Sequence, residues 1–133
     1  MKEDKIFFKD VYEKAIEKWG ETAQLLQAAE EANEFSRAII RVIQAKNLFN
    51  SKKILRKREL NLIEEIADLE IMIKQVKIIF KEAEEKIKRI REMKLLRTWY
   101  RTEEKEIDFF KWLNRKFNYS KEEFEDFYGE IKI

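Results

Sequence analysis

The sequence predicts an all-α protein, a helical bundle of four to five main helices with an aromatic-rich helical extension at its C-terminal end. Its 133 residues include no proline and two glycines, which favours long helices over a sheet built from hairpins. Apolar residues recur every three or four positions along most of the chain, as in amphipathic helices. We expect a single domain over 1–133, with a core of about 6–98 and an extension of about 99–133, because no linker or internal repeat divides the chain.

Composition excludes several classes of chemistry. The absence of cysteine excludes disulfides and zinc–thiolate sites, and the absence of histidine excludes a Ser-His-Asp triad. A net charge of +2 is too small for a polycation. No apolar run reaches the roughly 18 residues of a membrane span, and the first residues do not resemble a signal peptide. Cytoplasmic localisation is the expectation.

Turn and capping residues set the expected helix boundaries. Gly20 can end a first helix, and the Asn and Ser near position 50 favour a turn. Ser120 and Glu123 form a capping box, the pattern that starts a helix. The expected helices are therefore 6–19, from Glu21 or Thr22 to about Asn47, about 56–80, 81–98, and a short one after Ser120.

The two central helices carry the main apolar stripes. The second helix is expected to pack through Ala28, Ala32, Phe35, Ile39 and Val42, and the third through Leu62, Ile66, Leu69, Ile73, Val76 and Phe80. The third helix is also apolar on its other side, at Leu60, Ile63, Ala67, Ile71 and Ile78. In so short a chain such a helix needs cover from a partner subunit, so we expect an obligate oligomer, a dimer or a tetramer.

Two pairs of acidic residues border these stripes. Glu31 and Glu34 lie three residues apart on the second helix, as do Glu65 and Asp68 on the third, so each pair shares a helix face. Four carboxylates at one packing seam are costly without a cation. Oxygen ligands without histidine or cysteine suit a hard ion, Mg²⁺ or Mn²⁺. The alternative is a solvated helix flank, since 42% of the residues are charged and such spacings arise by chance.

The acidic motifs resemble a known family. EEANE at 30–34 and EEIAD at 64–68, with their flanks, are similar to the EExxE and ExxD motifs of the MazG-like all-α nucleoside triphosphate pyrophosphohydrolases, over roughly residues 10–100. The connection at 35–64 is on the long side for such proteins. The resemblance implies Mg²⁺-dependent hydrolysis between the α- and β-phosphates of a nucleotide. It also implies that the metal ligands are Glu31, Glu34, Glu65 and Asp68.

Roles for the surrounding residues follow from this hypothesis. Glu34 or Glu65 would orient or deprotonate the attacking water. Lys94 and Arg97, which resemble the end of the family's pattern, would hold phosphate oxygens. Gln27 and Asn61 are candidates for hydrogen bonds to the ribose or the base. Lys94 and Arg97 are equally compatible with an ordinary solvated helix flank, and the sequence does not decide the role of Gln27 and Asn61.

Three other interpretations remain open. The chain is a helical interaction protein if the acids are ordinary bundle surface. It is a nucleic-acid binder if the basic segments 52–58 and 86–97 contact phosphates, although the near-neutral net charge argues against this. It is a family member that has lost turnover or prefers an unusual nucleotide if the acids bind metal without the common activity. The ten aromatic residues after position 98 either pack against the bundle or stack on a nucleobase.

Overall fold

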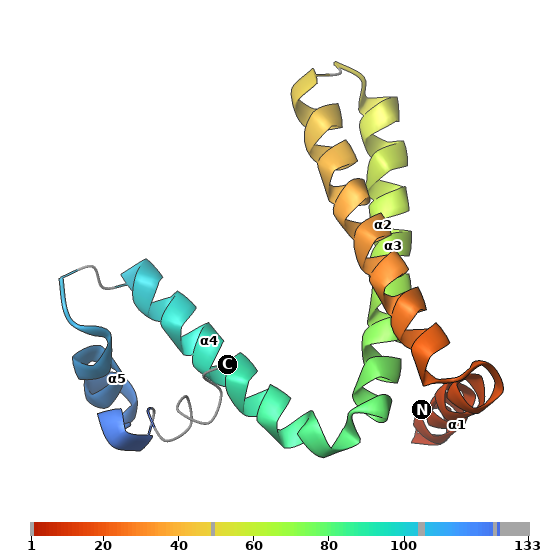
Figure 1. Ribbon diagram of the computed structural model, residues 1–133. Coiled ribbons are helices and arrows are strands. Elements are labelled where there is room, and N and C mark those ends of the chain that lie inside the picture. The colour runs from red at the N-terminus through yellow and green to blue at the C-terminus, as the bar shows by residue number, and fades with distance from the viewer. Residues whose placement is uncertain (1, 49, 104–105, 124, 126–133) are drawn as a thin grey trace. The chain divides into compact units, whose positions relative to one another are not determined.

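The computed structural model describes residues 2–48, 50–103, 106–123 and 125, with side chains from Phe7 onward. These residues form helices joined by short connections and include no strand, which confirms the all-α prediction (Figure 1). None of the described helices is both long and apolar enough to cross a membrane. The elements are α1 (Lys2–Trp19), α2 (Glu21–Leu48), α3 (Lys52–Ile79), the 3₁₀ turn η1 (Lys81–Ala83), α4 (Glu84–Glu103) and α5 (Phe109–Phe117).

Contacts divide the chain into two compact units, Met1–Ala83 and Glu84–Ile133. The first contains α1, α2, α3 and η1, and the second contains α4 and α5. The division falls earlier in the chain than the start of the expected extension near position 99. A single domain over the whole chain stays a prediction.

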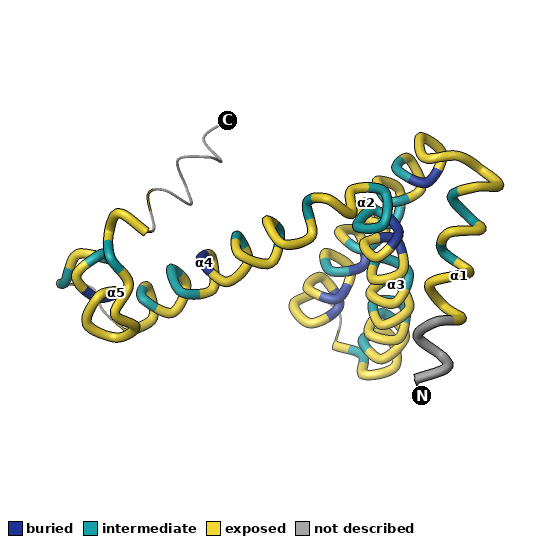
Figure 2. Tube along the Cα trace, turned by 90° about the horizontal axis from the view of Figure 1, so that it is seen from below, coloured by how far each residue is buried: buried dark blue, intermediate teal, exposed yellow. Residues whose placement is uncertain are grey.

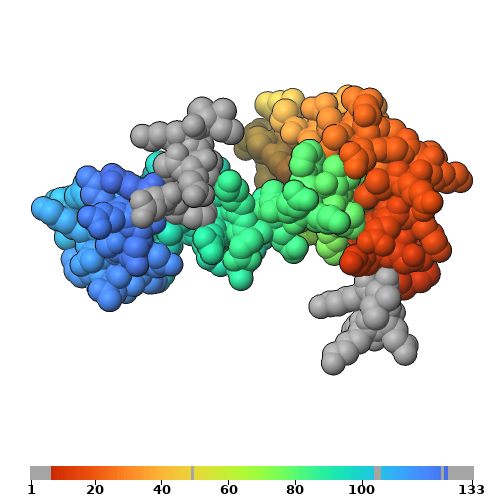
Figure 3. Space-filling model, turned by 60° about the horizontal axis from the view of Figure 1, so that its bottom comes forward, coloured from red at the N-terminus to blue at the C-terminus, as the bar shows by residue number. Residues whose placement is uncertain are grey.

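Gly20 separates α1 from α2, as the sequence predicts. Its φ of +87° lies in the left-handed region that glycine adopts at low cost. The Gly20 amide donates to the Ile16 carbonyl at 2.8 Å and closes α1, while the Gly20 carbonyl accepts from the Gln24 amide at 3.2 Å and opens α2. The chain changes direction there, so α1 packs against both α2 and α3. Figure 3 shows α1 and the start of α2 as one continuous surface in red and orange.

The hairpin of α2 and α3 is the main body of the first unit (Figure 1). Both helices are 28 residues long, and they run side by side in opposite directions. Ser51 caps α3, because its hydroxyl accepts from the Ile54 amide at 3.4 Å. The helix therefore begins one turn before the expected position 56. The basic residues 52–58 lie in its first two turns rather than partly in a loop.

The packed face of the hairpin coincides with the expected one only in part. Val42 is buried as predicted, and half-buried stripe residues are Ala28, Phe35, Ile39, Leu62, Leu69 and Val76. The buried apolar residues are Ala38, Val42 and Ala45 on α2 and Met72 on α3, and few positions of the trace are buried at all (Figure 2). Four other predicted stripe residues are exposed, namely Ala32, Ile66, Ile73 and Phe80. Alanines at the seam let two helices approach closely. On a helix that is apolar nearly all round, periodicity alone does not select the packed face.

The core of the second unit is aromatic. Trp112 and Leu113 of α5 are fully buried and pack on Met93 of α4, with Leu96 and Tyr100 of α4 beside them. The Trp112 ring lies 5.6 Å from the Tyr100 ring, centroid to centroid, at 60°, an edge-on contact that aromatic pairs favour. Aromatic packing, rather than exposure for stacking, therefore accounts for the centre of this cluster.

Local capping explains both ends of α5, a helix that the sequence patterns did not predict. The Asp108 carboxylate accepts from the Phe110 amide at 2.9 Å at its start, and Asn118, with φ 56°, ends it in the left-handed conformation. The predicted capping box that follows is confirmed. The Glu123 amide donates to the Ser120 hydroxyl at 3.0 Å, and the Ser120 amide donates to the Glu123 carboxylate at 2.8 Å. Of the aromatic residues expected to pack or stack, Phe124, Phe127 and Tyr128 lie outside the described residues.

Candidate functional site

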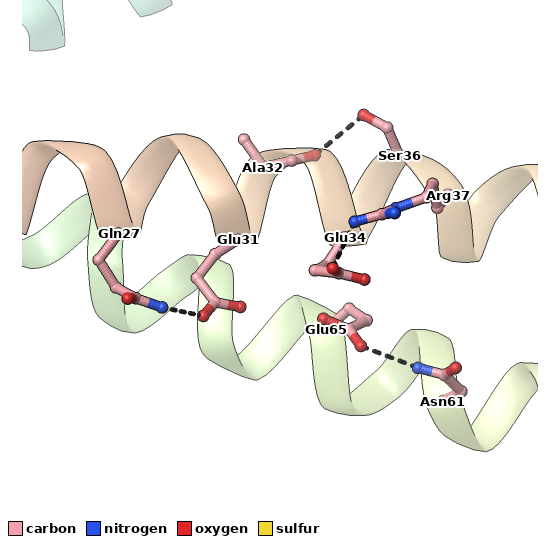
Figure 4. Close-up of polar contacts among 8 residues, drawn as sticks. All are labelled: Gln27, Glu31, Ala32, Glu34, Ser36, Arg37, Asn61 and Glu65. Atoms are coloured by element: carbon pink, nitrogen blue, oxygen red, sulfur yellow. Dashed lines mark hydrogen bonds and ion pairs between the residues drawn. The ribbon is translucent and has the colours of Figure 1, made fainter.

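The hairpin brings acidic residues from α2 and α3 together. Glu31 on α2 and Asp68 on α3 lie nearly the same number of residues from the turn near Asn50, so an antiparallel pairing places them side by side. Glu65 is one helical turn from Asp68. Figure 4 shows Glu31 and Glu65 pointing toward each other from the two helices.

Three carboxylates converge closely enough to share a cation. One oxygen from each of Glu31, Glu65 and Asp68 lies within 4.8 Å of the other two, and Glu31 and Glu65 are half-buried. Ligand oxygens around Mg²⁺ lie about 2.1 Å from the ion, so neighbouring ligands are about 3.0 Å apart and opposite ligands about 4.2 Å. The three side chains would have to move closer together to reach these separations. The donor set, with oxygen ligands alone, fits a hard divalent cation.

An amide one turn earlier on the same helix holds each half-buried acid. Gln27 Nε2 donates to Glu31 Oε1 at 2.6 Å, and Asn61 Nδ2 donates to Glu65 Oε1 at 3.0 Å (Figure 4). Each contact uses one carboxylate oxygen and leaves the second available to a cation. The amides predicted to contact ribose or base thus contact the acids here.

The fourth predicted ligand, Glu34, is outside the triad. Its carboxylate forms an ion pair with Arg37, one turn further along α2, and its side chain is 47% exposed (Figure 4). Arg37 is the one basic residue near either acidic pair in the sequence, and it is the residue that draws Glu34 aside. The structure therefore brings together three of the four predicted ligands.

Two buried glutamines continue the same seam. Gln24 on α2 is 8% exposed and Gln75 on α3 is 4% exposed, each two helical turns from an acid of the triad. Gln75 Oε1 has no hydrogen-bond partner among the described residues. Neither glutamine was singled out from the sequence as a site residue. Their position beside the acids was the available signal.

The predicted phosphate-binding residues lie in the second unit. Lys94 is exposed and Arg97 half-buried, both on α4. Arg97 takes part in a polar or ring contact of its own. Their role toward the acidic triad of the first unit stays a prediction.

Comparisons of the chain with protein-family models, with curated proteins and with solved structures return no match.

Proposed function

We propose that this protein is a Mg²⁺-dependent nucleoside triphosphate pyrophosphohydrolase, which converts an NTP or dNTP to the monophosphate and pyrophosphate. The observation that supports the proposal is the convergence of Glu31, Glu65 and Asp68 across the α2–α3 seam. The resemblance of residues 30–34 and 64–68 to the MazG-like motifs gives the reaction class. Such an enzyme would act in the cytoplasm, in house-cleaning or control of the nucleotide pool.

In this proposal the triad acids hold the cation. The hydrogen bonds from Gln27 and Asn61 keep the carboxylates of Glu31 and Glu65 in place. Mg²⁺, or Mn²⁺ in its stead, would neutralise phosphate charge and acidify a bound water. Glu34 or Glu65 would accept the proton of the water that attacks the α-phosphorus, while the bond to the β-phosphate oxygen breaks. Glu34 would first have to leave its ion pair with Arg37. Lys94 and Arg97 would steady the departing pyrophosphate.

The test is pyrophosphate release from a panel of NTPs and dNTPs with Mg²⁺. We expect wild type to hydrolyse at least one of them. Glu34→Gln and Glu65→Gln should each lower the rate by roughly two orders of magnitude, the contribution of a general base. Glu30→Gln is the matched control, because Glu30 is an exposed acid next to the triad and outside it. Activity equal in all four proteins, or no activity in wild type across the panel, would contradict the proposal.

A second candidate function is that of a non-enzymatic helical interaction protein. It is favoured by the exposed apolar side chains of the hairpin, among them Ile40 on α2 at 53% and Ile63 on α3 at 62%. The same surface supports self-association of the enzyme into a dimer or tetramer, so exposure alone does not separate the two functions. The response to Mg²⁺ and nucleotide separates the two functions, because a purely structural protein should melt at the same temperature with and without these ligands.

A further inference from the structure

The turn end of the α2–α3 hairpin is strongly positive. Residues 41–59, which include the last two turns of α2 and the first two turns of α3, contain seven basic residues and one acidic residue. The rest of the two helices, 21–40 and 60–79, contains eight acidic residues and three basic residues. Figure 1 places α1 at the opposite end of the hairpin, away from the turn. The hairpin is therefore polarised, with positive charge at the turn and negative charge toward its other end.

Four of the basic residues share the outward side of α3. Successive residues of a helix are about 100° apart, so these four fall within an arc of about 140°. All four are exposed, whereas Leu55 and Leu62, on the other side of the helix, are half-buried. The four residues, called the tip bases below, are Lys52, Lys53, Arg56 and Lys57.

The fold does not neutralise these charges. Within the part of the chain that the structure describes, none of the tip bases takes part in an ion pair or a side-chain hydrogen bond. The first turn of α3 contains Lys52 and Lys53 and no acidic residue. The partial positive charge at the start of a helix disfavours cations there. An anionic partner would relieve this repulsion.

The spacing of the tip bases fits the phosphates of a nucleic acid. Lys52 and Arg56 are about 6 Å apart along the helix axis, and Lys53 and Lys57 are separated by the same rise. Each strand of a DNA duplex carries one phosphate about every 3.4 Å along the axis, so two steps cover about 7 Å. Basic side chains that contact phosphates hold the duplex without reading its sequence.

The neighbouring side chains favour a duplex over a single strand or a membrane. Proteins that bind single strands stack the bases on aromatic side chains, and residues 36–48 and 50–79 contain none. A helix that lies in a membrane surface keeps basic and apolar residues on opposite faces. Here the exposed Leu60 and Ile63 continue the face of the tip bases, so burial of these two side chains in lipid would press the cations toward the acyl chains.

We propose that the tip bases bind the phosphate backbone of duplex nucleic acid without regard to sequence. The net charge of +2 is compatible with such binding, because the acids that balance the basic residues lie away from the turn. A duplex would repel the acidic end of the hairpin, so the hairpin approaches it with the turn first. The contact involves no nucleotide hydrolysis and is independent of the proposed enzymatic activity.

Fluorescence anisotropy with short labelled DNA duplexes of two unrelated sequences tests the proposal. Four phosphate contacts predict equal affinity for both sequences, and a loss of about 100-fold in affinity between about 50 and 200 mM salt. Lys52→Gln with Arg56→Gln removes half of these contacts and should reduce that loss to about tenfold. The matched control is Lys14→Gln with Lys74→Gln, which removes the same charge at exposed positions outside the tip and should bind as the wild type does.

A second measurement uses the wild type alone and covers the case in which the variants do not fold. Its lysines are acetylated with and without duplex, and mass spectrometry locates the modified positions. The duplex should slow acetylation of Lys52, Lys53 and Lys57 several-fold and leave Lys14 and Lys74 unchanged.

Four outcomes would each overturn the proposal. They are no duplex binding at about 50 mM salt, equal weakening by the two double variants, tighter binding to a single strand of the same length, and protection of the tip lysines by anionic lipid vesicles but not by duplex.

Discussion

At the scale of single residues, the acidic triad makes a prediction that does not require the substrate. Three carboxylates within 4.8 Å repel one another, and at this distance the repulsion of one pair is about 1 kcal/mol in water. Glu65→Gln removes two of the three pairs and should therefore raise the free energy of unfolding in EDTA by about 1–2 kcal/mol. We expect Mg²⁺ to raise the melting temperature of the wild type, and the same change should abolish that increase. Thermal denaturation by circular dichroism, with EDTA and then with Mg²⁺, measures both effects.

Glu64→Gln is the control for this prediction, because Glu64 is an exposed neighbour that does not belong to the triad. It should leave the unfolding free energy and the Mg²⁺ response unchanged. If Glu65→Gln responds to Mg²⁺ as the wild type does, the triad is an ordinary cluster of surface acids.

The individual acids also show what the sequence could and could not predict. Spacing along each helix placed Glu31, Glu65 and Asp68 at the seam, and the structure brings them together. Glu34 has the same spacing, but its side chain turns to Arg37. Periodicity gives the direction of the Cα–Cβ bond, whereas the rotamer of a long side chain depends on its nearest partner. The sequence therefore predicted the face of the site better than its ligands.

At the scale of elements, the sequence predicted helix existence well and helix faces less well. Gly20 and Ser51 mark boundaries through local backbone chemistry, and the structure follows them closely. The packed face of α3 was predicted less well, because this helix carries apolar residues on nearly all of its sides. The seam uses Met72 and Gln75 instead of Ile66 and Ile73. Contacts with another helix decide this choice, and they are not encoded in the pattern of one helix alone.

The junction of α1 and α2 gives a prediction about an element boundary. Gly20→Ala should lower the free energy of unfolding by about 1–2 kcal/mol, since an L-residue with positive φ is strained. A Cβ at this position would meet no atom within 4 Å, so the cost comes from the backbone alone. Gly20→Asn should cost less, because asparagine tolerates the left-handed region better. Urea denaturation of the three proteins tests the order, and an alanine variant as stable as the wild type would contradict it.

At the scale of the whole molecule, the first unit leaves more large apolar side chains outside than inside. On α3 alone, Leu60 and Ile63 are about three-fifths exposed, at 60% and 62%, while the one buried apolar residue of that helix is Met72. Exposed patches of this kind mark interaction surfaces. A second copy of the chain is the proposed cover, in a dimer or tetramer. The change that tests it is Leu60→Ser combined with Ile63→Ser.

These two substitutions would have a small effect on a monomer and a large effect on an oligomer. In a monomer both side chains are already in water, so their loss costs little stability. In an oligomer each buried side chain contributes about 1.5–3 kcal/mol to the interface, so the double variant should dissociate at protein concentrations where the wild type stays assembled. Sedimentation velocity measures this, with Lys14→Ser on the exposed surface of α1 as the control. If the two chains associate, the melting temperature of the wild type should also rise with protein concentration. A wild type that sediments as a monomer at micromolar concentration would contradict the proposed interface.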